Sequence, residues 1–141
     1  MSMKTYVWGL LIVCILLFAG CAGNNMAVHI NDDDVIDIAD PYFSEWIQEI
    51  QFNREQFLGR TIRYEGFFLS MYWEGETIYS VLRFTQGCCG LHGFEVYLNE
   101  IAPLPDDTWV EVTGILEEFY VEVVSRYFMR LNVLSLTAVS H

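Results

Sequence analysis

The sequence predicts a mainly β protein, a small OB-like barrel of five strands with one helix at its N-terminal edge. Five runs of alternating apolar residues lie between residues 60 and 139, and alternation is the period of a half-buried strand. Two of these runs contain a central glycine, Gly66 and Gly114, where a strand of a closed barrel can bend. A chain of 141 residues with 16% aromatic residues has room for one domain with a substantial core.

The helix is expected to start at Asp40 and Pro41, because aspartate is a good N-cap and proline is tolerated in the first turn. Apolar residues then recur at intervals of three and four, which predicts one apolar stripe that packs on the core. Gly59 ends the pattern. The stripe consists of Phe43, Trp46, Ile47 and Ile50.

From residue 60 onward the apolar period is two, and turn residues separate the runs. Trp73 to Glu76 and Pro103 to Asp107 are predicted turns. We expect each run to have one face made up of the following residues: Ile62, Tyr64 and Phe68; Ile78, Ser80, Leu82 and Phe84; Phe94, Val96 and Leu98; Val110, Val112, Gly114 and Leu116; Met129, Leu131 and Val133.

The N-terminus predicts export and a lipid anchor. A short polar start with one lysine precedes an apolar run over residues 6–18, and Ala19-Gly20-Cys21 follows. The run is shorter than the about 20 residues that a membrane span needs, and it fits the apolar region of a signal peptide. Small residues before Cys21 resemble the lipobox of bacterial lipoproteins, which implies cleavage after residue 20 and acylation of Cys21. An uncleaved anchor and an ordinary signal peptide are the alternatives.

Residues 21–40 are predicted to be an acidic tether, followed by the barrel domain over residues 41–141. The run Asp32-Asp33-Asp34 is interpreted as a solvated spacer, with a cation site as the alternative. Without residues 1–20 the chain has six arginines against nineteen acidic residues, a net charge of −13. Such a surface repels phosphate groups, so we expect no nucleic-acid partner.

The stretch around Cys88 and Cys89 is the candidate site. These two thiols and the imidazole of His92 are ligands that suit Zn²⁺ or Cu⁺, and Glu95 or water would complete a tetrahedral set. The alternatives are two thiols that only pack in the barrel, a strained vicinal disulfide that acts as a redox switch, and a Cys–His hydrolase pair. No orienting third residue supports the hydrolase, so we expect no enzymatic activity.

Arg83 lies just before this stretch and is one of few cations in the chain. It is expected either to have a structural role, by pairing with a barrel acid such as Glu65 or Glu95, or to bind a ligand.

Several short motifs, in this order, resemble the C-terminal domain of a bacterial envelope family of unknown function, the permease-subunit proteins. They are Gly59-Arg60, Tyr64-Glu65-Gly66-Phe67, Arg83-Phe84, Cys88-Cys89 and Trp109-Val110-Glu111-Val112-Thr113-Gly114.

The resemblance implies an extracytoplasmic location and a permease partner, and some members of the family are associated with zinc homeostasis. Two features differ from that family: a lipid would replace the usual membrane spans, and Gly90-Leu91-His92 follows the cysteines where an Ala-Asp-like continuation is expected. We therefore expect a lipid-anchored accessory domain at the cell membrane that binds a ligand such as zinc or supports an envelope permease. A purely structural interaction module and a thiol-redox protein remain alternatives.

Overall fold

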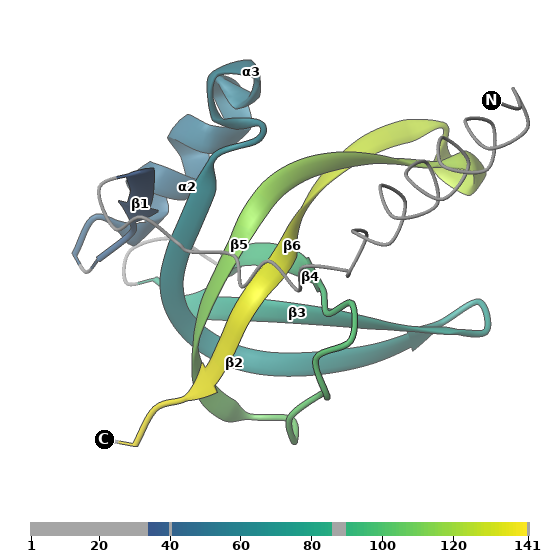
Figure 1. Ribbon diagram of the computed structural model, residues 1–141. Helices are drawn as coiled ribbons and strands as arrows, with labels where there is room; N and C mark the ends of the chain where they lie inside the picture. The colour runs from purple at the N-terminus through teal and green to yellow at the C-terminus, as the bar shows by residue number, and fades with distance from the viewer. Residues whose placement is uncertain (1–33, 40, 86–89, 141) are drawn as a thin grey trace, which may run out of the picture.

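The computed structural model describes residues 34–39, 41–85 and 90–140, and Figure 1 shows their arrangement. Two helices come early in the chain and all but one of the strands follow them. The elements are β1 (Val35–Asp37), α2 (Phe43–Phe52), α3 (Arg54–Phe57), β2 (Thr61–Trp73), β3 (Glu76–Phe84), β4 (Leu91–Tyr97), β5 (Thr108–Val121), a 3₁₀ turn (Glu122–Val124) and β6 (Arg126–Ala138).

Five strands close into a barrel in the order β2–β3–β4–β6–β5, and β5 pairs back onto β2. The β4–β6 pair is parallel, whereas the other four pairs of the barrel are antiparallel. This five-stranded Greek-key barrel with its N-terminal helix confirms the predicted OB-like fold.

A sixth strand, β1, was not predicted. It pairs in parallel with the first residues of β2, and Ile38, the residue that directly follows it, is buried. These residues fall within the range that the sequence analysis assigned to the acidic tether, so the sheet includes part of that segment. Arg63 on β2 fixes β1 further by an ion pair of 3.1 Å to Asp37.

The helical stripe packs on the barrel as predicted. Phe43, Ile47 and Ile50 are buried, and Trp46 lies edge-on to the ring of Phe57 in α3. Residue 40, the predicted N-cap, lies outside the described residues. In the described part, Tyr42 is the N-cap residue and its side chain makes no capping hydrogen bond.

The predicted faces of four strands turn towards the core, whereas the predicted face of β3 turns outward. The buried residue of β3 is Val81, and Phe84 is 70% exposed, so Ile78, Ser80, Leu82 and Phe84 form the outer face. Both faces of β3 carry apolar residues, so the alternation alone did not determine which one turns inward.

Gly66 shows how β2 reaches two partners. Strand β2 pairs with β5 up to Phe68 and with β3 from Phe67 onward. A Cβ atom at residue 66 would lie 2.8 Å from the carbonyl oxygen of Leu82, so only glycine allows the two backbones to approach this closely. The predicted bend at Gly66 therefore lies where β2 passes from one neighbour to the other.

The buried apolar core is built from residues between Ile38 and Val133. Among the described helices, none has both the length and the apolar character required to span a membrane.

Candidate functional site

The predicted metal ligands fall into two groups. Cys88 and Cys89 lie outside the described residues, as does the predicted acylation site Cys21, whereas His92 and Glu95 are both on β4. Side chains of a strand point alternately to its two faces. His92 therefore shares a face with the buried Phe94, and Glu95 lies on the other face.

His92 is half-buried and lies near the start of β4, a few residues after the two cysteines in the sequence. Its backbone is paired with that of Arg83 on β3, so the two residues flank the segment that contains Cys88 and Cys89. The His92 Nε2 atom is buried and has no hydrogen-bond partner among the described residues. The same holds for the Thr85 hydroxyl oxygen, at the end of β3 on the other side of that segment. Buried polar atoms normally have partners, so these two atoms suggest a ligand or a neighbouring group here.

The backbone next to His92 is fixed by a close approach. Gly93 has a positive φ of 150°, and a Cβ atom there would overlap the carbonyl oxygen of Val81 on β3. Tyr64 holds the following residue, because its buried hydroxyl accepts a hydrogen bond from the Phe94 N–H at 3.1 Å and donates one to the Val81 carbonyl at 2.7 Å. Strands β2, β3 and β4 therefore position His92 together.

Glu95 has a different environment from His92. It lies opposite Arg130 of β6, and burial raises the pKa of the Glu95 carboxyl although Arg130 acts to lower it. The described residues contain no group of three or more histidine, cysteine, aspartate or glutamate residues arranged to hold a metal ion. Alternation along β4 separates Glu95 from His92, because the two side chains point to opposite faces of the strand.

Arg83 contacts two aromatic rings. Its guanidinium carbon lies 5.5 Å from the centre of the Phe43 ring and 5.3 Å from that of Trp109. The Trp109 indole in turn donates a hydrogen bond of 2.8 Å to the Glu65 carboxylate. Desolvation lowers the pKa of Arg83. A structural role predicts contacts of this kind, because through Arg83 they join helix α2 to strand β5. That Arg83 binds a ligand stays a prediction.

Over residues 21–141 the sequence matches the family described as the DUF1980 C-terminal domain. The chain belongs to this family. The match covers the whole barrel and agrees with the resemblance to an envelope domain of unknown function, as the motifs indicated. No curated protein matches the chain at a significant level.

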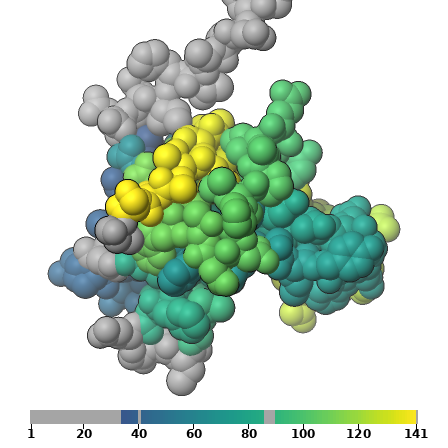
Figure 2. Space-filling view, turned by 90° about the horizontal axis from the view of Figure 1, so that it is seen from below, coloured from purple at the N-terminus to yellow at the C-terminus, as the bar shows by residue number. Residues whose placement is uncertain are grey.

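This DUF1980 domain also has a surface that the sequence analysis missed. Two hairpins project to the same side of the barrel, the β2–β3 hairpin and the β5–β6 hairpin (Figure 1). Seen from below, the β2–β3 hairpin forms a lobe beyond the body, and parts of the β5–β6 hairpin are visible behind it (Figure 2). We call these hairpins the aromatic arms and define their exposed apolar residues as Met71, Tyr72, Trp73, Tyr120, Val123, Val124, Tyr127 and Phe128.

The second hairpin was missed because it has no glycine or proline. Its turn is the 3₁₀ segment after β5, completed by Ser125 in a left-handed conformation with φ 50°. The clustered aromatic residues at 119–120 and 127–128 were the available signal, because such residues are enriched in strands.

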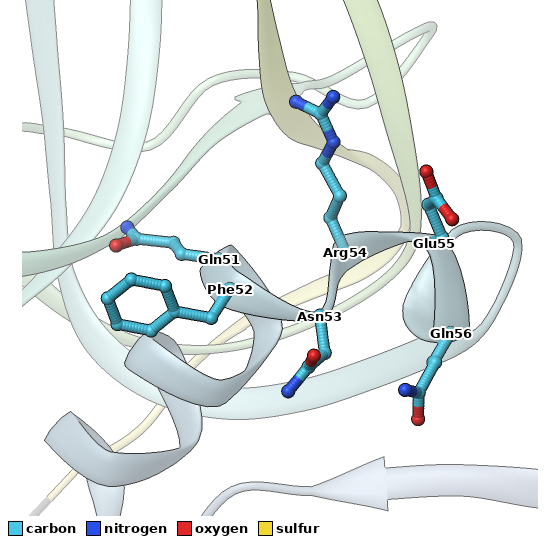
Figure 3. A pocket seen from close by; sticks show the side chains of 6 residues that line it. All are labelled: Gln51, Phe52, Asn53, Arg54, Glu55 and Gln56. Carbon is cyan, nitrogen blue, oxygen red and sulfur yellow. The ribbon is translucent and has the colours of Figure 1, made fainter.

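A concavity of about 480 Å³ lies at the junction of α2 and α3 (Figure 3). It is lined by six consecutive residues, Gln51 to Gln56, so it is a notch at the helix break and not a cleft between elements. Arg54 in this segment forms an ion pair of 3.2 Å with Glu118 of β5, which joins α3 to the barrel. The notch brings together no residues from distant parts of the sequence.

Proposed function

We propose that this DUF1980 domain is a non-enzymatic accessory domain of the bacterial envelope, anchored by a lipid on Cys21, which binds a transition-metal ion such as Zn²⁺ or supports an envelope permease. The observation that supports the metal site is the buried, unpartnered Nε2 atom of His92. A neutral imidazole nitrogen of this kind is a good zinc ligand, and Cys88 and Cys89 follow β3 closely enough in sequence to supply thiolates.

The proposed ligand set is Cys88, Cys89 and His92, with water as the fourth ligand. Glu95 is left out because alternation places it on the other face of β4, next to Arg130. Bound zinc would hold the two ends of the segment between β3 and β4 together. The Thr85 hydroxyl could then accept or donate a hydrogen bond to a metal-bound water.

The test is a zinc titration of residues 21–141 with Cys21→Ser, reduced and stripped of metal, against a chromophoric chelator. We expect one zinc per chain and at least a tenfold weaker affinity in Cys88→Ser, Cys89→Ser and His92→Ala. Glu95→Gln is the matched control and should bind zinc like the parent.

Two results would contradict the metal site. The first is a parent protein that binds no zinc; the second is a His92→Ala variant with unchanged affinity. The redox alternative is measured on the same protein, by counting free thiols by mass before and after mild reduction. Two thiols that become free only on reduction would favour a Cys88–Cys89 disulfide over the metal site.

The lipid anchor has its own test. Expression of the full-length chain in a bacterial host should yield a membrane-bound protein whose mass includes the acyl groups. A Cys21→Ala variant should be released from the membrane or remain unprocessed. If it stays membrane-bound at the processed mass, the anchor does not depend on Cys21.

A further inference from the structure

The aromatic arms concentrate the exposed apolar surface of the molecule. Eight of the thirteen exposed large apolar side chains in the described part of the chain lie on these two hairpins. Tyr72 is 76% exposed, Val123 69% and Tyr127 62%. Scattered surface apolar residues are ordinary, but a cluster rimmed by polar residues is typical of an interaction site.

The β5–β6 arm is held in place at its base. Arg130 lies 4.6 Å from the ring centre of Tyr97 and 4.7 Å from that of Phe119, and it forms an ion pair of 2.7 Å with Glu117. These contacts join β4, β5 and β6 where the arm leaves the barrel. A preformed surface loses little conformational entropy when a partner binds.

Cross-strand aromatic pairs continue towards the tip of this arm. Phe119 faces Phe128 with ring centres 6.2 Å apart, and Tyr120 faces Tyr127 at 5.0 Å. By alternation, Tyr120 and Tyr127 share the strand face of the buried core, and the other pair lies on the opposite face. Both faces of the arm therefore present aromatic rings for contact.

The rim of the arms is acidic. Glu74, Glu76 and Glu122 are exposed at the two tips, and Arg126 is the one exposed basic residue among the described residues of these tips. The whole chain has a formal net charge of −12. Anionic lipid surfaces, nucleic acids and a second copy of this chain are all disfavoured as occupants by like-charge repulsion.

We infer that the aromatic arms are the docking surface for a basic protein segment, one in which lysine or arginine residues alternate with apolar side chains. Aromatic anchors surrounded by a charged rim are the usual composition of a protein interface. OB barrels also bind their ligands between the corresponding hairpins. The inference deepens the accessory role proposed above by giving its partner a chemistry, and it does not depend on metal binding.

The test uses residues 21–141 with Cys21→Ser, immobilised and probed with a phage-displayed library of random twelve-residue peptides. The arm variant combines Tyr72→Ser, Trp73→Ser, Tyr127→Ser and Phe128→Ser. The matched control combines Tyr42→Ser and Phe52→Ser, which are 64% and 83% exposed but lie outside the arms. Thermal melting of each variant establishes that it is folded.

We expect the selected peptides to be rich in Lys and Arg with apolar residues between them. The affinity of the best synthetic peptide should fall at least tenfold in the arm variant, stay within twofold in the control, and decrease with added salt. A His92→Ala variant should bind it unchanged, which separates this inference from the metal site.

Three outcomes would overturn the inference. One is a selection that enriches no basic peptides, or peptides that bind the arm variant equally well. Another is stronger binding of the lipid-free protein to phosphatidylglycerol–phosphatidylethanolamine vesicles, lost in the arm variant, which would make the arms a membrane surface. The third is a dimer in solution that the arm substitutions dissociate. If the four-residue arm variant does not fold, Tyr72→Ser and Tyr127→Ser are tested singly.

Discussion

Replacing Tyr64 with phenylalanine should destabilise the barrel by about 3 kcal/mol. The Tyr64 hydroxyl is buried and makes two hydrogen bonds, one to the Val81 carbonyl and one from the Phe94 N–H. Phenylalanine keeps the ring and its packing against Phe43 and Phe94, at 5.4 and 6.1 Å between ring centres. The substitution therefore leaves one buried acceptor and one buried donor without partners, and each such group costs roughly 1–3 kcal/mol.

Urea unfolding of residues 21–141, followed by tryptophan fluorescence, measures this loss. With a slope of about 1–3 kcal/mol per molar urea, the midpoint should fall by roughly 1–3 M. Tyr79→Phe is the matched control on β3: it removes a hydroxyl for which the described structure has no hydrogen bond, and it keeps the stacking on Phe68. A loss below about 1 kcal/mol, or the same loss in the control, would refute the role assigned to the Tyr64 hydroxyl.

The pH dependence gives a second readout of the same group. Burial raises the pKa of Tyr64 well above its usual range, although the hydrogen bond from Phe94 acts to lower it. The folded state therefore keeps the proton that an unfolded tyrosine loses near pH 10. The stabilisation is complete below about pH 10 and decreases as the pH rises further, by up to about 1.4 kcal/mol per pH unit. This decrease should be smaller in Tyr64→Phe, and equal slopes in the two proteins would contradict it.

Three further substitutions test the neighbourhood of the candidate site. Gly93→Ala should lower the free energy of unfolding by at least about 3 kcal/mol, because the new methyl group meets the β3 backbone. Gly90 has a positive φ but open space around it, so Gly90→Ala should lower the free energy of unfolding by about 1–2 kcal/mol. The urea midpoints of the two variants measure the difference. Burial raises the pKa of Glu95 despite Arg130, so the folded state disfavours the ionised carboxyl. Glu95→Gln should therefore be at least as stable as the parent at pH 7, with a smaller difference near pH 4, in thermal melts at both pH values. Arg83→Lys keeps the charge but loses planar stacking on two rings, so it should cost about 1 kcal/mol in urea unfolding; a stability equal to that of the parent would show that the stacking contributes nothing.

Much of the barrel could be predicted because its inward faces alternate without ambiguity. On β5, for example, Val110, Val112 and Leu116 are apolar and buried, and the polar residues Glu111 and Thr113 alternate with the first two. β3 is the exception, since Tyr79 and Val81 on one face and the apolar residues on the other are equally suitable for a core. Its inward face is determined by its neighbours, because Val81 pairs with the buried Phe68 and Phe94.

Within the candidate site, the pairing of Glu95 with His92 could have been questioned from the sequence alone. His92 and Glu95 are three residues apart, and an odd spacing within one strand puts two side chains on opposite faces. The predicted strand contained Phe94, Val96 and Leu98, and the observed strand β4 begins earlier, at Leu91, so that it includes His92 as well as Glu95. The burial of the His92 Nε2 atom, in contrast, depends on contacts between strands that no local pattern encodes.

Strand β4 links the proposed metal site to the stability of the barrel. It pairs with β6 through only Glu95, Val96 and Tyr97, whereas β5 pairs with β6 along almost its whole length. The first half of β4 therefore depends on β3, on the close contact at Gly93 and on the Tyr64 hydroxyl. A metal ion held by His92 and the preceding cysteines would close the segment between β3 and β4, and its binding to the folded state alone would stabilise the barrel by mass action. The aromatic arms lie on β2, β3, β5 and β6, so a partner there could bind without contacting β4 at His92.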